Sequence, residues 1–199
     1  MTLDRLRPIA DRALGPWVRL AGWAGLSPDG VSIIAFAMAL VAAVGFALAV
    51  PVGYAIGAVA VFLNGWLDLV DGALARVEGT AAPEGDLLDH VLDRYADLII
   101  IGALAVGIDA YAAGLLAITG VLMTSYMGTQ IQAVGLDRAY GGLIGRADRL
   151  ALVAIAGGLV AVGITSVGDV QLLWALLVGF GIIGHLTALQ RFIDAWRRL

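Results

Sequence analysis

The chain has 199 residues, of which 61% are hydrophobic and 14% charged, and it contains no cysteine. A soluble domain is nearer half apolar and lacks repeated apolar runs of about 20 residues, so this composition indicates an integral membrane protein. The absence of cysteine excludes disulfides and thiolate metal sites, and the net charge of −4 comes with twelve arginines and no lysine.

The N-terminal region mixes arginines with apolar residues over 2–24, a pattern typical of an interfacial helix that lies on a membrane. Pro8 and Pro16 are expected to break or bend it. No cleavable signal peptide is expected, because no compact apolar core precedes a small-residue cleavage site. Ser27-Pro28-Asp29 predicts the start of the next helix, since serine can cap free amide groups and proline fits a first turn. We therefore expect an interfacial segment over 1–27.

Six apolar stretches follow, and each is long enough to cross a hydrocarbon core of roughly 30 Å. They lie at about 30–50, 52–75, 86–108, 111–134, 148–166 and 170–193. The sequence predicts an all-α polytopic membrane protein with a single domain over 1–199 and six transmembrane helices over 28–199. Within the second stretch, Gly53 and Gly57 have the small-xxx-small spacing that lets helices approach closely.

The arginines predict the orientation. With six spans, all twelve fall on one side of the membrane, and the loops near Pro51, Asp109 and Asp169 carry none. The positive-inside rule then places both termini in the cytoplasm of a multi-pass cell-membrane protein. It also places the junction between the second and third spans there.

That junction carries an acidic stretch from Asp68 to Asp93, which has the pattern D-x-x-D-G-x-x-A-R, eight residues, then G-x-x-x-D-x-x-x-D. Asp68 and Asp71 share one helix face, and Asp89 and Asp93 share another. Four carboxylates brought together cannot all stay ionised without cations, and oxygen ligands favour Mg²⁺ or Mn²⁺, with room for two ions. Such a pair stabilises charge in phosphoryl transfer. The sequence therefore predicts a metal site at this junction.

The same stretch resembles the signature of the CDP-alcohol phosphotransferase family at every fixed position. The resemblance implies an enzyme of phospholipid synthesis that cleaves a CDP-linked lipid, releases CMP and passes the phosphatidyl-type group to an acceptor hydroxyl. It implies that Asp68, Asp71 and Asp89 bind the metals, and that Asp93 completes the cluster and acts as the catalytic base. The residues implied to contact the CDP moiety are Asp68, Gly72, Ala75, Arg76 and Gly85. The family typically forms homodimers, so a homodimer is expected.

A second polar region at 125–150 carries candidates for binding the acceptor. Fixed positive charge suits an anionic acceptor, and the arginines expected to supply it are Arg138, Arg146, Arg149 and Arg191. The segment GGLIGRADRL is similar to the inositol-phosphate-using branch of the family. That branch usually has S-Y-x-K-A-R-A before this loop, whereas this chain has SYMGTQI. The expected acceptor is therefore a polyol phosphate, either glycerol phosphate or inositol phosphate, with a neutral acceptor such as serine as the alternative.

Two further alternatives follow from composition and charge. The absence of lysine is typical of a GC-rich genome and also of halophiles, in which the donor would be CDP-archaeol. A transporter could use an acidic cluster as an ion site, but its ionisable residues would be expected nearer mid-membrane.

His90 is expected to miss the metal face, because it lies about 100° round the helix from Asp89. The expected partners are the lipid donor, a small polar acceptor and membrane lipids, not nucleic acid.

Overall fold

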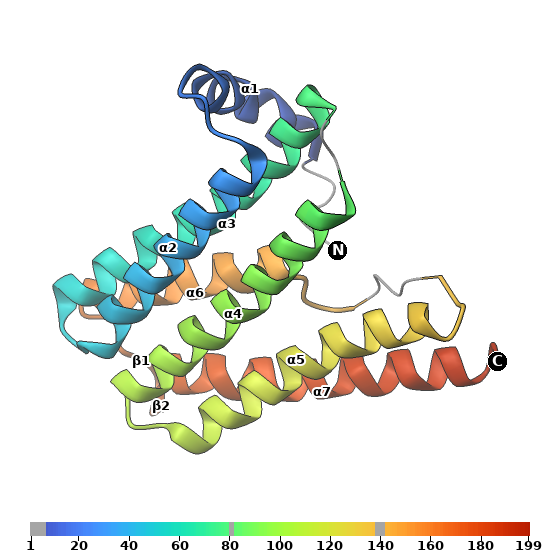
Figure 1. Ribbon diagram of the computed structural model, residues 1–199. Helices are drawn as coiled ribbons and strands as arrows, with labels where there is room; N and C mark the ends of the chain where they lie inside the picture. Colours follow the sequence, from blue (N-terminus) through green and yellow to red (C-terminus); the bar gives the residue numbers. More distant parts are fainter. Residues whose placement is uncertain (1–6, 80–81, 138–141) are drawn as a thin grey trace.

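The computed structural model describes residues 7–79, 82–137 and 142–199, with side chains described from residue 13 onward. The described chain is almost entirely helical, as expected, with one short β-hairpin (Figure 1). The elements in order are α1 (Arg7–Trp23), α2 (Pro28–Ala47), α3 (Pro51–Glu78), α4 (Pro83–Gly107), α5 (Tyr111–Ala133), α6 (Arg146–Ala161), β1 (Ser166–Val167), β2 (Val170–Gln171) and α7 (Leu172–Trp196).

The start of α2 confirms the predicted serine cap. The backbone amide of Gly30 donates to Ser27 Oγ at 3.1 Å, and Pro28 occupies the first turn. Proline also opens α3 at Pro51 and α4 at Pro83. At these positions a missing N–H costs no helical hydrogen bond, so each proline fixes where its helix begins.

Helix α1 is continuous from Arg7 to Trp23, so the chain does not break at Pro16, and the alternative expectation of a bend there stays a prediction. Leu14 and Val18 flank this proline and are buried in one cluster with Val70 and Leu74 of α3. Burial of these side chains offsets the hydrogen bond that a proline inside a helix removes. Pro8 lies in the first turn of α1, where its effect is small.

Helices α2 and α3 approach each other closely at glycines, as the small-xxx-small spacing predicts. A Cβ added at Gly53 would lie 2.5 Å from the carbonyl oxygen of Gly45, so no larger residue fits there. The ring of Phe46 fills the space beside Gly57 and is fully buried. This contact fixes α3, and with it Asp68 and Asp71, relative to α2.

Helix α6 is shorter than the predicted span at 148–166 and ends at Ala161. Gly163 adopts φ 92°, a left-handed conformation that glycine tolerates best, and the amide of Ile164 donates to the Leu159 carbonyl at 2.9 Å. A hairpin follows, in which Val167 pairs with Val170. The left-handed glycine ends the helix early, although the apolar sequence continues.

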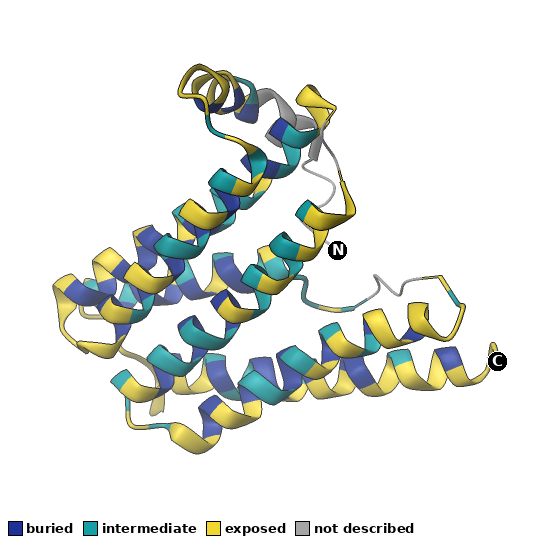
Figure 2. Ribbon diagram, viewed as in Figure 1, coloured by how far each residue is buried: buried dark blue, intermediate teal, exposed yellow. Residues whose placement is uncertain are grey.

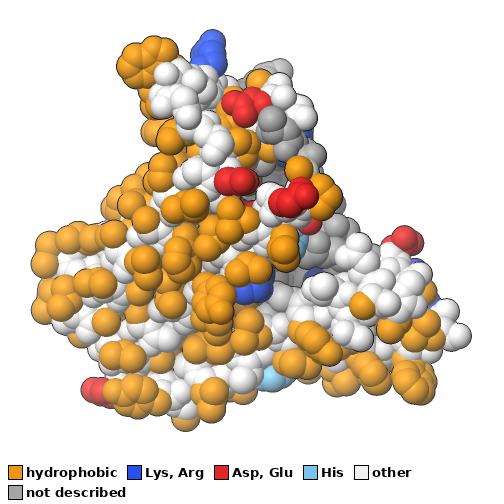
Figure 3. Space-filling view, in the orientation of Figure 1, with side chains coloured by type: hydrophobic (Ala, Val, Ile, Leu, Met, Phe, Trp, Pro, Cys, Tyr) orange, Lys and Arg blue, Asp and Glu red, His pale blue; other side chains and the backbone are white. Residues whose placement is uncertain are grey.

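Among the described residues, four helices are long and apolar enough to cross a membrane: α2, α3, α5 and α7. Helix α4 has 25 residues, but its first half carries Glu84, Asp86, Asp89 and Asp93, and α6 has only 16 residues. The described part of the chain has six helices after α1, but two of them fall outside these limits of length and composition. The outer faces of the helices carry exposed residues (Figure 2), and most of the face drawn in Figure 3 is apolar, as lipid contact requires.

The turns of the bundle gather at two ends. The α2–α3 turn, the α4–α5 turn and the hairpin lie at the left of Figure 1, whereas the α3–α4 junction and the C-terminus lie away from them. The core between these ends contains Phe46, Ile100, Leu104 and Leu177. The acidic motif therefore lies at the end of the bundle opposite the arginine-free turns.

Candidate active site

Three carboxylates converge where the last third of α3 meets the first half of α4. Ligand oxygens of Asp68, Asp71 and Asp89 lie within 4.8 Å of one another. Asp71 is buried and the other two are half-buried. Ser32 Oγ of α2 donates to Asp71 Oδ2 at 2.7 Å and orients that carboxylate. The motif spacing brings these groups together because residues three or four apart share a helix face.

Asp93 lies one helical turn beyond Asp89, but its nearest charged partner is an arginine. Arg146 Nη2 lies 2.7 Å from Asp93 Oδ1, and Arg146 Nη1 lies 2.8 Å from Asp68 Oδ2. One guanidinium thus bridges α3 and α4 from the first residue of α6. All four aspartates of the motif line one narrow gap, three of them within ligand distance of one another, and Arg146 bonds to two of the four.

A buried acid beyond the motif, Asp97, anchors two further arginines. Asp97 is only 4% exposed. Its Oδ2 accepts from Arg149 Nη2 at 2.8 Å and from Arg94 Nη1 at 3.2 Å. Sequence reasoning did not assign a function to Arg94 or Asp97. Their three-residue spacing on one helix was the available signal.

A cavity of about 420 Å³ opens on one side of the carboxylates, between the start of α2, the end of α3 and the start of α4. We call it the acidic cavity, because five of its six charged lining residues are acids: Asp29, Asp71, Glu78, Asp86 and Asp89. Four of the residues implied to contact CDP also line it, namely Gly72, Ala75, Arg76 and Gly85. The fifth, Asp68, lies in the narrow gap among the carboxylates.

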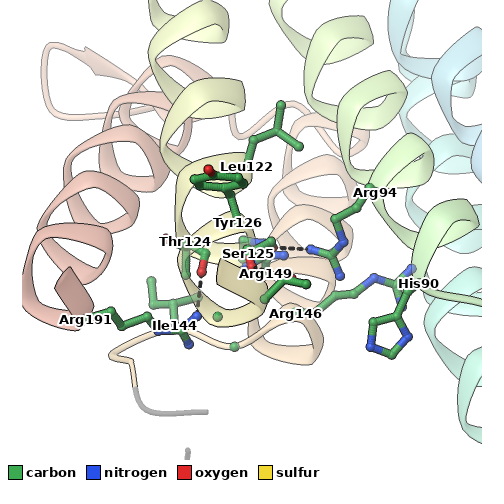
Figure 4. Close-up of a pocket in the computed structure, with 13 residues that line it drawn as sticks. His90, Arg94, Leu122, Thr124, Ser125, Tyr126, Ile144, Arg146, Arg149 and Arg191 are labelled. Atoms are coloured by element: carbon green, nitrogen blue, oxygen red, sulfur yellow. Dashed lines mark hydrogen bonds between the residues drawn. The ribbon is translucent and has the colours of Figure 1, made fainter. Parts of the chain in front are cut away.

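A second cavity, of about 550 Å³, opens on the other side between α4, α5, α6 and α7 (Figure 4). We call it the basic cavity, because its lining includes Arg94, Arg146, Arg149 and Arg191. Within the part of the chain that the structure describes, no carboxylate lines it. It brings together three of the four arginines predicted to bind the acceptor and adds Arg94. The fourth, Arg138, lies outside the described residues.

Polar groups of α5 hold two of these arginines in place. Arg94 Nη1 donates to Ser125 Oγ, and Arg191 Nη1 donates to the Thr124 carbonyl oxygen, each at 2.5 Å. Gly128 also lines the cavity, at the position where the related branch has lysine. His90 lines it too and is not one of the three clustered ligands. The position at which this chain lacks the lysine of the related branch therefore lies in the wall of the basic cavity.

The site as a whole has two compartments of opposite charge that meet at Asp68, Asp89 and Arg146. Figure 3 shows acidic side chains in the upper part of the molecule and a basic side chain at the base of a nearby hollow. Three carboxylates with ligand oxygens this close could hold a metal ion, and oxygen-only ligation suits Mg²⁺ or Mn²⁺. A metal-bound anion on one side could react there with a second anion held by arginines on the other.

Comparison with known proteins identifies relatives over nearly the whole chain. Residues 26–186 match the family model for CDP-alcohol phosphatidyltransferase. The chain is 31% identical over 198 residues to archaetidylinositol phosphate synthase of Methanothermobacter thermautotrophicus, a match that covers 99% of this chain and 95% of that protein. It is 30% identical over 203 residues to phosphatidylinositol phosphate synthase of Streptomyces avermitilis, covering 96% and 81% of the two chains.

Solved structures agree with these sequence matches. The crystal structure of Mycobacterium tuberculosis phosphatidylinositol phosphate synthase with CDP-DAG bound superposes with a TM-score of 0.80 at 26% identity, covering 93% of this chain and 94% of that one. The same enzyme in complex with manganese and citrate also gives 0.80, covering 92% and 88% of the two chains.

Proposed function

Because the chain belongs to the CDP-alcohol phosphatidyltransferase family, we propose that it transfers a phosphatidyl or archaetidyl group from a CDP-linked lipid to the hydroxyl of a polyol phosphate, with release of CMP. Membership makes the chain a membrane-bound transferase, as the aspartate motif led us to expect. The observation that carries the proposal is the pair of oppositely charged cavities on either side of one carboxylate cluster.

Mg²⁺ or Mn²⁺ fits the residues present. Asp68, Asp71 and Asp89 would hold the first ion, and we propose a second ion that also engages Asp93. When bound, the metal neutralises negative charge on the phosphoryl group being transferred. The relative solved with manganese supports this choice of cation.

The acidic cavity is the proposed donor site. A CDP-linked lipid carries a pyrophosphate, which would be repelled by five acids unless cations were bound among them. Arg76 can form paired hydrogen bonds to a phosphate, and Gly72 and Gly85 leave room for a bulky ligand near the backbone. CDP-DAG is bound in the related structure, and the proposed donor here is CDP-diacylglycerol or CDP-archaeol.

In the proposed reaction, the acceptor hydroxyl oxygen attacks the lipid-bearing phosphorus of the donor. A new P–O bond forms, the bond from that phosphorus to the bridging oxygen breaks, and CMP leaves with that oxygen. Asp93 takes the hydroxyl proton, from a position between the donor-side carboxylates and the basic cavity. A positioned general base of this kind contributes roughly 10²–10⁴-fold to rate.

The basic cavity is the proposed acceptor site, with Arg146, Arg149 and Arg191 as its binding residues. Four arginines suit the phosphate of glycerol phosphate or inositol phosphate. They give no reason for a neutral acceptor such as serine, and the relatives are an archaetidylinositol phosphate synthase and a phosphatidylinositol phosphate synthase. A transporter is not favoured, because the family to which the chain belongs consists of transferases.

We also propose the membrane arrangement expected from the sequence. All six helices from α2 to α7 would cross the bilayer, with the two short or charged ones shielded by neighbours, and α1 would lie in the interface. The site and both termini would face the cytoplasm, where CTP-derived donors and soluble acceptors are available. The active form would be a homodimer.

A direct assay tests the proposed function. Purified protein in detergent is incubated with Mn²⁺, CDP-diacylglycerol and either glycerol phosphate, inositol phosphate or serine, and CMP release is followed. Release with a polyol phosphate, abolished by chelation with EDTA, is expected. A chain that releases CMP only with serine would contradict the assigned acceptor class, and no release with any acceptor, beside an active relative, would contradict the enzyme assignment.

A further inference from the structure

Arg146 is the one side chain that lines both the basic cavity and the narrow gap among the carboxylates, within the described part of the chain. Its two terminal nitrogens hold Asp68 and Asp93 at 2.8 and 2.7 Å, which are distances of strong charge-assisted hydrogen bonds. Asn64 Oδ1 lies 3.4 Å from the same Nη2. Arg146 therefore occupies the position from which Asp93 would have to meet an acceptor hydroxyl.

The other described arginines of the basic cavity are arranged differently. Arg149 hydrogen-bonds to Asp97, outside the motif, at 2.8 Å. Arg94 Nη2 lies 3.6 Å from Asp93 Oδ2, beyond hydrogen-bond distance, and its shorter contacts are to Asp97 and Ser125. Arg146 alone among them makes short bonds to two aspartates of the motif.

The backbone at Arg146 is held at the start of α6, so the contacts of this residue can change only through its side chain. It is the first residue of α6, and the amide of the preceding Gly145 donates to Asp148 Oδ2 at 2.9 Å. A phosphate entering the basic cavity would compete with Asp68 and Asp93 for this guanidinium, because arginine binds phosphate and carboxylate with the same bidentate geometry.

We propose that Arg146 couples acceptor binding to the release of Asp93, and so keeps the enzyme from hydrolysing its donor when no acceptor is present. The inference rests on the proposed function. Without an acceptor, water could attack the lipid-bearing phosphorus, displace CMP and leave a lipid phosphate monoester, with the water proton passing to Asp93. While Arg146 occupies Asp93 Oδ1, that proton acceptor is blocked. Once the acceptor phosphate draws Arg146 away, Asp93 faces the acceptor hydroxyl.

The first test compares CMP release without and with inositol phosphate in the wild type, Arg146→Gln and Arg146→Lys. In Arg146→Gln the rate of CMP release without acceptor should rise at least about tenfold over the wild type, a typical size for coupling between sites. Arg146→Lys should fall between the two, since one ammonium group cannot bridge both aspartates. Arg197→Gln is the control, because Arg197 is exposed and lines neither cavity; it should leave that rate at the wild-type value.

A second test does not depend on turnover. The affinity for Mn²⁺, followed by electron paramagnetic resonance, should rise at least about fivefold when inositol phosphate is added to the wild type, because withdrawal of Arg146 removes a competing cation from Asp68. Arg146→Gln should bind Mn²⁺ more tightly from the start and lose this response, whereas Arg149→Gln should start at the wild-type affinity.

Gel filtration and CDP-lipid binding establish that the Arg146→Gln protein is folded. A wild-type rate of CMP release without acceptor, or a wild-type affinity for Mn²⁺, in that folded protein overturns the inference. If the wild type itself shows no turnover with any polyol phosphate, the proposed function fails, and the Mn²⁺ titration alone then decides the role of Arg146.

Discussion

The acidic and basic cavities share one carboxylate cluster but are built in opposite ways. The acidic cavity is formed at the beginnings and ends of three consecutive helices, α2 to α4, and its charged lining is mainly acidic. The basic cavity is formed by α4, α5, α6 and α7 and is lined by four arginines. Both proposed ligands are anions, so the difference indicates two modes of binding. The donor would be held through metal ions, and the acceptor directly by guanidinium groups.

Replacing Asp93 tests the junction between the two cavities and should have the largest effect. Asp93→Asn removes the proton acceptor and should lower acceptor-dependent CMP release by about 10²–10⁴-fold. Asp93 does not line the acidic cavity, so equilibrium binding of CDP-diacylglycerol should persist. Loss of donor binding together with turnover would mean that Asp93 acts chiefly as a metal ligand.

Substituting one arginine in each cavity distinguishes donor binding from acceptor binding. Arg149→Gln should raise the acceptor KM about 10–100-fold, the range expected for loss of a hydrogen bond to a charged group, and leave the donor KM nearly unchanged. Arg76→Gln should produce the reverse pattern, since Arg76 lines the acidic cavity. Steady-state kinetics with each substrate varied in turn measures both. Equal changes in the two constants for either variant would contradict the division into two sites.

Two serines offer a matched pair with smaller effects. Ser32 donates to Asp71 on the metal side, and Ser125 accepts from Arg94 on the acceptor side. Ser32→Ala should raise the Mn²⁺ concentration needed for half-maximal rate by about tenfold, as for other groups that orient metal ligands. Ser125→Ala should raise the acceptor KM by about threefold. If Ser32→Ala and Ser125→Ala raised the Mn²⁺ concentration for half-maximal rate equally, the separation of the metal side from the acceptor side would be contradicted.

The smallest effect is expected from narrowing the acidic cavity. A Cβ at Gly85 would lie 3.2 Å from Asp29 Oδ1, so Gly85→Val must displace neighbouring atoms and occupy space proposed for the donor. The donor KM should rise about threefold with the acceptor KM unaffected. Gly85→Ala serves as the milder control. If the donor KM were the same in the wild type, Gly85→Ala and Gly85→Val, Gly85 would not lie in the donor site.

The contrast between the cavities also explains what could be predicted from the sequence. The carboxylates and the glycines beside them lie within 26 consecutive residues, Asp68 to Asp93, so helical spacing alone predicts how they are grouped. The serine cap of α2 and the all-helical architecture followed from equally local signals. The family expected from the motif is confirmed by the match over residues 26–186.

Three features of the structure were not predictable from helical spacing or apolar periodicity. The pairing of Arg149 with Asp97 joins residues 52 positions apart, and nothing local to either predicts it. The continuity of α1 through Pro16 depends on packing against α3. The early end of α6 depends on one left-handed glycine within an apolar stretch. Apolar periodicity carries no information on any of these three features.

The buried group of Asp97, Arg94 and Arg149 has a consequence for how acceptor preference could change in evolution. Replacing Asp97 by a neutral residue would leave the buried Arg149 and the half-buried Arg94 without their shared carboxylate, which is strongly destabilising. A descendant that used an uncharged acceptor would therefore need several coordinated substitutions, with unstable intermediates between them. Lineages of this chain should thus retain an anionic acceptor.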